Sequence, residues 1–261
     1  MKKLYIIPNA KDAEGSLRLA ARYGAGFEYN DFSAPEVLDD EAETERLIGI
    51  YRSLDRDRSE DMLHGAYLDV TVHSADPLIR AVSDRRVRTS LDIARRLGIR
   101  GAVFHTNCIP NFKNPLYRES WLESNASYWR GIASEYAELD IYMENMFDAD
   151  PELLAVLAER LSDVKNFGVC LDVAHACVFS DGDIKWFRRL SPHIAHVHIN
   201  DNDFENDLHA EIGTGMIDFW IYDQEVRMTG RSPSVLVEIK DTESQRRSIE
   251  YLEKNGFYPF D

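Results

Sequence analysis

Short hydrophobic runs alternate with longer amphipathic stretches along almost the whole chain. Eight of these runs have the length and residue content of buried β-strands. They are KLYIIPN (3–9), GAGFEYN (24–30), MLHGAYLDV (62–70), GAVFHTN (101–107), LDIYMENMF (139–147), GVCLDVAHA (168–176), IAHVHIND (194–201) and SVLVEIKD (234–241). Their nearly continuous hydrophobicity is typical of parallel strands that are covered on both faces.

The stretches between the runs have helical spacing. Over residues 77–98 one apolar stripe consists of Val87, Leu91 and Ala94, and Gly98 is a typical helix end. A second stripe, after Asp150 as the predicted cap and Pro151 as the first helical residue, consists of Leu153, Leu157, Leu161 and Val164. Shorter helices are predicted near 13–23, 41–55, 117–138, 217–228 and 242–254, and the segment 183–190 stays undecided.

Eight strands separated by helices in a chain of 261 residues predict one (β/α)8 TIM barrel that spans residues 1–261 as a single domain. A doubly wound open sheet has the same alternation of elements and is the structural alternative. The two folds differ in where they bring the ends of the strands. The polar residues at the strand ends can therefore distinguish the barrel from the open sheet.

Most of the runs contain, near their C-terminal ends, a side chain of the kind that binds metal ions. From the third run to the eighth these residues are His64, His105, Glu144, Asp172, His198 and Glu238. In a barrel they converge on the face where active sites lie, whereas an open sheet spreads them along a line. Carboxylates with imidazoles suit Mn²⁺, Mg²⁺, Co²⁺ or Zn²⁺, and a cation offsets the cost of burying the carboxylates. The sequence therefore predicts a barrel with a divalent-metal site.

Three further histidines are not predicted to bind metal. His196 lies two residues before His198, on the same strand face and one layer deeper, so it is predicted to be a hydrogen-bonded core residue. His73 and His193 stand in loop or helix contexts and are predicted to be solvated surface residues. Aromatic residues at helical spacing, such as Trp121 and Trp129, are more typical of a core than of a sugar-stacking site.

The stretch DLHAEIGTGMIDF is unusual because it combines two metal-ligand side chains with two closely spaced glycines. Asp207 and His209 precede Gly213 and Gly215, and a helix capped by Asp218 is predicted to follow. The spacing of the glycines predicts a tight turn. The segment is too short to be identified as a phosphate-binding loop by itself.

Composition limits the partners and the compartment. The net charge of −16 opposes binding to nucleic acid or anionic membranes, because both are polyanions. The three cysteines, Cys108, Cys170 and Cys177, have no disulfide-like spacing and predict reduced thiols. No apolar run is long enough for a signal-peptide core or a membrane span. We therefore expect a cytoplasmic protein with no membrane partner.

Several segments resemble, in order and spacing, the xylose isomerase-like barrel superfamily. They are GVCLDVAHA, HVHINDND, LHAEIGTGMIDF and LVEIK. This grouping includes sugar and sugar-phosphate isomerases and epimerases as well as endonuclease IV, an abasic-site nuclease. The similarity covers the chain from His64 onward.

The isomerase and epimerase branch implies one divalent ion and a sugar substrate. The matching ligands are Glu144, Asp172, His198 and Glu238. Glu144 and Glu238 would then be the catalytic proton acceptor and donor on opposite faces of a small sugar, sugar phosphate or cyclitol, through an enediolate. The substrate-binding positions implied by this branch are His64, His105 and His175. A cation both acidifies the carbon beside a carbonyl and stabilises the resulting oxyanion.

The endonuclease IV branch implies three zinc ions and phosphodiester hydrolysis of abasic DNA. One ion would be held by His64, His105 and Glu144, a second by Glu144, Asp172, His198 and Glu238, and a third by His175, Asp207 and His209. Tyr67 and Leu68 resemble the residues that this type of nuclease inserts into DNA.

The ligand count leaves both branches open. The net charge and the absence of a basic cluster after His105 favour the isomerase branch and make a nucleic-acid partner the weaker expectation. Phe204 stands where many ketose 3-epimerases have an arginine, which argues against that specificity. A non-catalytic binding subunit is the third alternative, but it needs no opposed glutamates. Related barrels often associate, so a homo-oligomer is a further expectation.

Overall fold

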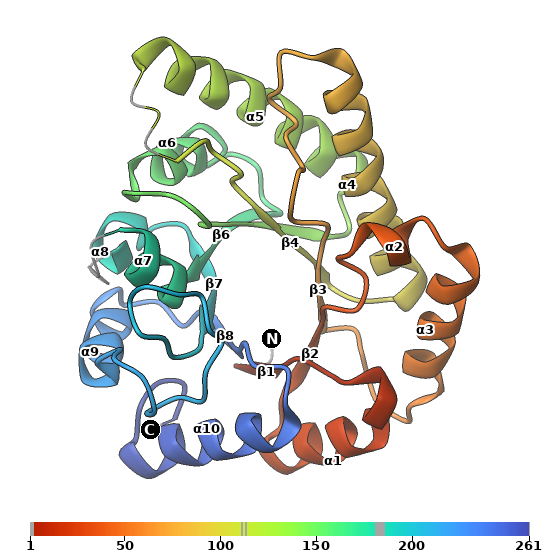
Figure 1. Ribbon diagram of the computed structural model, residues 1–261, viewed down its shortest axis with the longest axis vertical. Coiled ribbons are helices and arrows are strands. Elements are labelled where there is room, and N and C mark those ends of the chain that lie inside the picture. The colour runs from red at the N-terminus through yellow and green to blue at the C-terminus, as the bar shows by residue number, and fades with distance from the viewer. Residues whose placement is uncertain (1–2, 111, 113, 181–185, 261) are drawn as a thin grey trace.

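Eight parallel strands form a closed barrel in which each strand pairs with the next and β8 pairs with β1 (Figure 1). The computed structural model describes residues 3–110, 112, 114–180 and 186–260. The strands are β1 (Leu4–Ile6), β2 (Gly26–Tyr29), β3 (Met62–His64), β4 (Gly101–His105), β5 (Asp140–Glu144), β6 (Phe167–Asp172), β7 (Ile194–Ile199) and β8 (Ser234–Val237). The predicted single (β/α)8 barrel is confirmed, and each strand is shorter than its hydrophobic run because the chain leaves the sheet to build the loops at the C-terminal face.

Helices surround the barrel (Figure 1). They are α1 (Ala13–Tyr23), α2 (Pro35–Leu38), α3 (Glu41–Ser53), α4 (Pro77–Leu97), α5 (Pro115–Glu135), α6 (Glu152–Arg160), α7 (Val173–Phe179), α8 (Trp186–Leu190), α9 (Phe219–Met228) and α10 (Thr242–Asn255), with a short 3₁₀ helix over Ala10–Asp12. Gly98 ends α4 in the left-handed conformation, as predicted. Helices α2 and α7 were not predicted, and part of the undecided segment, 183–185, lies outside the described residues.

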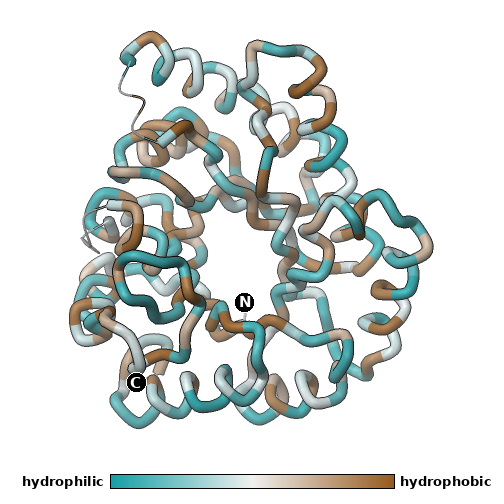
Figure 2. The backbone as a smooth tube through the Cα atoms, viewed as in Figure 1, coloured by the Kyte–Doolittle hydropathy of each residue, from teal (hydrophilic) through white to brown (hydrophobic). Residues whose placement is uncertain are grey.

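Two hydrophobic layers hold the barrel. The larger one fills the space between strands and helices, where Trp121 and Trp129 are buried as expected. The smaller one fills the barrel itself and consists of Tyr5, Ile7, Met62, Val103, Tyr142, Cys170 and Leu236. In Figure 2 hydrophilic and hydrophobic residues alternate along the outer helices. The barrel interior is therefore a packed floor beneath the C-terminal face, where the predicted ligands lie.

Helix α7 changes the interpretation of GVCLDVAHA. Strand β6 ends at Asp172, and the carboxylate of this residue caps α7 by accepting a hydrogen bond of 2.6 Å from the backbone N–H of His175. The run after Asp172 is therefore helical rather than extended. Because a helix advances by only about 1.5 Å per residue, α7 keeps the buried His175 close to the end of β6.

The prediction for His73 and His193 was wrong, since both are half-buried. The ring of His73 lies 5.9 Å from the ring of Trp121 and 6.2 Å from that of Tyr117. Burial lowers the pKa of His73 to about 4, so this residue is neutral at pH 7. Packing of α5 over the β3–α4 loop covers His73, a tertiary effect that the loop sequence does not reveal.

Candidate metal centre

All nine predicted ligands lie at the C-terminal face of the barrel and form three groups in which the ligand atoms are within 4.8 Å of one another. We call Glu144, Asp172, His198 and Glu238 the inner cluster, from the ends of β5 to β8. We call His64, His105 and Glu144 the side cluster, from β3 to β5. We call His175, Asp207 and His209 the outer cluster, from α7 and the β7–α9 loop. Glu144 belongs to two of the three clusters.

Glu144 directs its two carboxylate oxygens to different clusters. Its Oε2 lies 3.3 Å from His105 Nε2 and 3.6 Å from His64 Nε2, in the side cluster. Its Oε1 lies 3.3 Å from His198 Nδ1, in the inner cluster. Glu144 is fully buried, and neither oxygen has a hydrogen-bond partner among the described residues. A buried carboxylate with two unsatisfied oxygens is costly unless cations compensate it, so Glu144 fits a bridging ligand.

Asp172 is held by its backbone and leaves one oxygen free for the site. The side chain of Asn145 accepts from the N–H of Asp172 at 2.9 Å and donates to its carbonyl at 2.9 Å. Asp172 Oδ1 caps α7, while Oδ2 has no partner among the residues that the structure describes. This orphaned oxygen is the atom that Asp172 offers to the inner cluster.

Three of the histidines are oriented through their Nδ1 atoms. His175 Nδ1 donates to the carbonyl of Asn145 at 2.9 Å, and His209 Nδ1 donates to the carbonyl of Glu238 at 2.9 Å. His64 Nδ1 lies 3.1 Å from the carbonyl of Gly65. A proton on Nδ1 leaves the Nε2 lone pair directed into the site, which is the usual arrangement for a metal-binding histidine. The orientation of these histidines is thus compatible with the divalent-metal site that the sequence predicts.

Glu28 on β2 is a residue of this centre that the sequence reasoning missed. Its Oε1 lies 3.2 Å from His198 Nε2 and its Oε2 lies 3.0 Å from His196 Nε2. His196 Nδ1 in turn lies 2.6 Å from Ser234 Oγ, so the prediction of a hydrogen-bonded core histidine is confirmed. Glu28 is positioned to orient His198 so that its Nδ1 faces Glu144 and Glu238.

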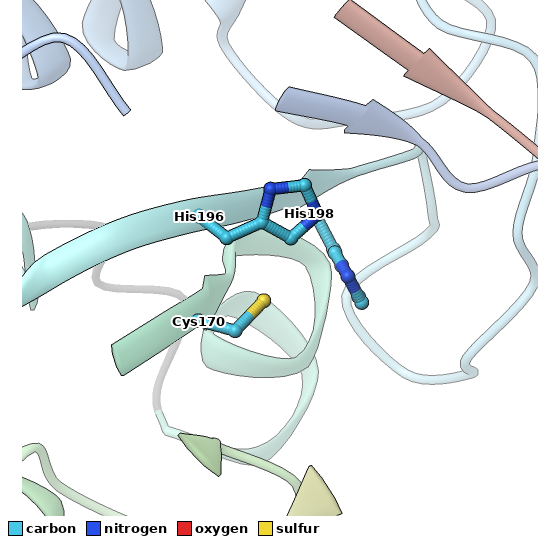
Figure 3. Close-up of side chains that lie close together, drawn as sticks. All are labelled: Cys170, His196 and His198. Atoms are coloured by element: carbon cyan, nitrogen blue, oxygen red, sulfur yellow. The ribbon is translucent and has the colours of Figure 1, made fainter. Parts of the chain in front are cut away.

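Cys170 lies in the layer beneath the inner cluster, near His196 and His198. Figure 3 shows the sulfur of Cys170 on β6 beside the two imidazoles of the neighbouring strand β7. All three side chains are fully buried. Burial raises the pKa of the Cys170 thiol well above its ordinary value, so the thiol stays neutral and packs as part of the floor.

The charges of the centre are strongly coupled. Burial raises the pKa of Asp172 to about 8. Burial also opposes ionisation of Glu144, but His198 and His105 hold the pKa of Glu144 well below its ordinary value. Burial lowers the pKa of His209, yet Glu238 and Asp207 raise it to about 10. Protons on Asp172 and on histidines thus offset the negative charge of the centre, and cations are able to take the place of those protons.

A cavity of about 150 Å³ opens above the centre. It is lined by Asn30, Ser33, His64, Tyr67, His105, Met146, His175, Asp207, His209, Glu238 and Lys240. Glu144, Asp172 and His198 lie beneath this lining and have no exposed surface. A molecule in the cavity therefore meets the side and outer clusters, together with Glu238, before it meets the rest of the inner cluster.

Fold and centre together define a TIM barrel whose C-terminal face gathers histidines and carboxylates that could hold metal ions. The sequence profile of the xylose isomerase-like TIM barrel family matches residues 17–255, and the chain belongs to that family. No helix in the described part of the chain has the length and hydrophobicity to span a membrane.

Two solved structures and one curated protein illustrate what the chain is similar to. The TTHB071 protein of Thermus thermophilus, solved after soaking with ZnCl₂, is 25% identical with a TM-score of 0.76, over 97% of this chain and 99% of that one. A D-tagatose 3-epimerase-like protein is 22% identical with a TM-score of 0.73, over 97% of this chain and 96% of that one. A protein of Halorhodospira halophila named Probable endonuclease 4 is 28% identical over 60% of this chain and 59% of its own length. The chain is therefore similar in fold to a D-tagatose 3-epimerase-like protein and in sequence to a protein named Probable endonuclease 4.

Proposed function

We propose that this protein is a metal-dependent phosphoester hydrolase with three divalent ions, one in each of the three clusters. The observation that carries this proposal is the division of Glu144, whose two oxygens serve the side and inner clusters separately. A second ion at the far oxygen of the same carboxylate would give the two buried histidines beside it, His64 and His105, a role as ligands. The similarity to Probable endonuclease 4 and to the zinc-soaked TTHB071 protein supports the proposal.

Divalent ions supply charge stabilisation at phosphoryl oxygens and lower the pKa of water that they bind. Nine side chains would hold the ions, and Asn145, Glu28 and backbone carbonyls orient these side chains. At the cavity wall Lys240 offers an ammonium and Asn30 an amide to the oxygens of a substrate. The buried floor of the barrel keeps bulk water away from the inner ligands.

The substrate that fits best is a small phosphoester rather than duplex DNA. The net charge of −16 repels a DNA backbone, and among the residues lining the cavity Lys240 is the one permanent cation. The cavity volume of about 150 Å³ is that of a small molecule. Tyr67 lines this cavity and the neighbouring Leu68 is exposed, so both are available to a substrate at the rim.

A one-ion sugar isomerase or epimerase is the second candidate, and a specific observation favours it. Glu144 and Glu238 both approach His198 Nδ1, at 3.3 and 3.4 Å, as two carboxylates around one ion site would. In this candidate His64, His105 and His175 bind the sugar rather than further ions. Against it, Glu144 is covered by the histidines, and Phe204 gives no cation at the position of the epimerase arginine.

The test is to count ions and to measure both reactions on the same preparation. The protein is saturated with Zn²⁺, dialysed, and analysed for metal per chain. It is then assayed with bis(p-nitrophenyl) phosphate, with an abasic DNA duplex and with a set of ketohexoses. We expect three ions and hydrolysis of the small phosphodiester. One ion together with epimerisation of a ketohexose would overturn the proposal in favour of the second candidate, and incision of abasic DNA alone would overturn the choice of a small substrate.

A further inference from the structure

The loop that carries Asp207 and His209 is built around the carboxylate of Asp201, the residue that follows the end of β7 by two positions. Asp201 is fully buried and accepts four backbone N–H groups. Its Oδ2 accepts from Gly213 and Gly215, both at 2.9 Å, and its Oδ1 accepts from Asn202 at 3.0 Å and Ile217 at 3.1 Å. One carboxylate thus satisfies the backbone on both sides of the two-glycine turn.

The backbone of Asp201 also fixes the position of His209. The N–H of Asp201 donates to the carbonyl of Ala210 at 3.0 Å, and the N–H of Ala210 donates back at 2.9 Å. This pair of bonds closes the loop immediately after His209. His209 itself has a φ of 46°, a left-handed conformation that a non-glycine residue keeps only when its surroundings impose it.

The neighbouring residue Asn202 connects the same loop to the third member of the outer cluster. Its Nδ2 donates to the carbonyl of Ala174 at 3.1 Å, next to His175 on α7. The carbonyl of Asn202 accepts from the N–H of Met216 at 2.8 Å, in the two-glycine turn. Asp201 and Asn202 thus form hydrogen bonds with the residues next to His209 and His175, two of the three residues of the outer cluster.

This carboxylate explains Gly215, and the backbone conformation explains Gly213. A Cβ atom at Gly215 would lie 2.4 Å from Asp201 Oδ1 and 2.4 Å from the carbonyl oxygen of Asn202, which leaves no room for a side chain. Gly213 has a φ of +88°. The turn therefore wraps an anion that belongs to the chain itself, and its N–H groups are occupied by Asp201 rather than by a phosphate.

We infer that Asp201 is a positioning residue that sets the affinity of the outer cluster for its divalent ion. The inference rests on the proposed three-ion function. The carboxylate of Asp201 binds the backbone of the loop and is not one of the nine ligands. Loss of its bonds therefore affects the ion of the outer cluster and leaves the strand-borne inner and side clusters in place.

The test is Asp201→Asn in the full chain. An amide keeps the shape of the carboxylate but turns an NH₂ donor toward two backbone N–H donors, so at least one pair is lost. The matched control is Asp203→Asn in the same loop, because Asp203 also accepts backbone N–H groups, from Glu205 and Asn206, but is only half-buried and its hydrogen bonds are exposed. Each protein is titrated with Zn²⁺, and metal per chain is measured after dialysis.

We expect Asp201→Asn to hold two ions and to bind the third about 10- to 100-fold more weakly than the wild type. Asp203→Asn should hold three. Backbone amides of the loop, followed by hydrogen exchange, should lose protection in Asp201→Asn while those of β7 and β8 keep it. The two retained ions and the protected strands show that the barrel is folded, so a merely unfolded variant is recognised.

Gly215→Ala is the second variant, because its Cβ displaces the same carboxylate from the other side. It should reproduce the selective loss of the third ion. Three ions of unchanged affinity in both variants would overturn the role of Asp201 while leaving the proposed function intact. Fewer than three ions in the wild type would instead overturn the proposed function, and the inference with it.

Discussion

The inner and outer clusters hold similar side chains on very different supports. The inner ligands come from four adjacent strands, and the pairing of Asp172 with His198 in the β6–β7 register brings them together. The outer ligands come from a helix of one or two turns and from a loop, and the side chains of Asp207 and His209 are 25% and 35% exposed. Closure of the barrel thus preorganises the inner cluster, whereas local hydrogen bonds must organise the outer one.

Replacing Glu144 should have the largest effect, since this residue serves two clusters. Glu144→Gln keeps the size of the side chain but gives one cluster an amide nitrogen in place of an anionic oxygen. We expect loss of at least one strongly held Zn²⁺ per chain and a fall in turnover by about 10³-fold or more. Metal analysis and steady-state kinetics measure both quantities. Glu138→Gln, at an exposed glutamate paired with Arg95, is the control and should change neither.

Glu28→Gln tests whether ion binding at the inner cluster depends on the contact between Glu28 and His198. Although burial raises it, His198 and His196 lower the pKa of Glu28 to about 2, so the residue is an anion between two imidazoles. An amide there removes the charge and one acceptor, and we expect the inner ion to bind about 10- to 100-fold more weakly. The outer ion should be unaffected. Equal weakening of all three ions would contradict the separation of the clusters.

The pH dependence of ion binding should be steep at the outer cluster. His209 has a pKa of about 10, so its ring is protonated at pH 7 when no ion is bound, and neighbouring carboxylates raise the pKa of His175 against the opposing effect of burial, which favours a proton there too. An ion must displace these protons, and its affinity should rise with pH by about tenfold per unit for each proton displaced. Zn²⁺ titrations between pH 6 and 8 measure this slope. An affinity that is independent of pH would contradict the assignment of these histidines as ligands.

Removal of the outer ion alone should have the smallest effect. At a free Zn²⁺ concentration ten times its Kd, an ion stabilises the folded chain by about 1.4 kcal/mol, which corresponds to about 3–6 °C in Tm. A weak chelator should remove the outer ion first and lower Tm by this amount, and a strong chelator should lower it further. Thermal unfolding with graded chelators checks the order. Restoring Zn²⁺ should return Tm to its starting value.

The candidate ligands at the strand ends could be identified from the sequence. Each of them places, within an apolar run, a polar or charged side chain whose burial costs free energy. Glu28 gives the same signal in GAGFEYN, but its partner His196 lies 168 residues away in sequence, and the closed barrel brings the two together. The side-chain geometry that divides Glu144 between two clusters has no counterpart in sequence spacing.

The surroundings of His175 and Asp201 were harder to predict. The change from strand to helix at Asp172 occurs within a few apolar residues, too few for either periodicity to be distinguished. Asp201 follows a strand as many loop residues do, and its role depends on N–H groups up to sixteen positions further along the chain. Such contacts follow from tertiary structure, so the sequence indicated the candidate ligands of the outer cluster and the tight turn but not the hydrogen bonds that hold them.

The inner cluster lies beneath the cavity lining, and this depth should set the order in which ions bind to the centre and leave it. Since Glu144, Asp172 and His198 have no exposed surface, an ion reaches them from the cavity by passing the residues of the side and outer clusters. An outer site filled first would obstruct this passage. The centre should therefore load from the bottom upward and unload from the top downward, and the inner ion should be the slowest to exchange with solution.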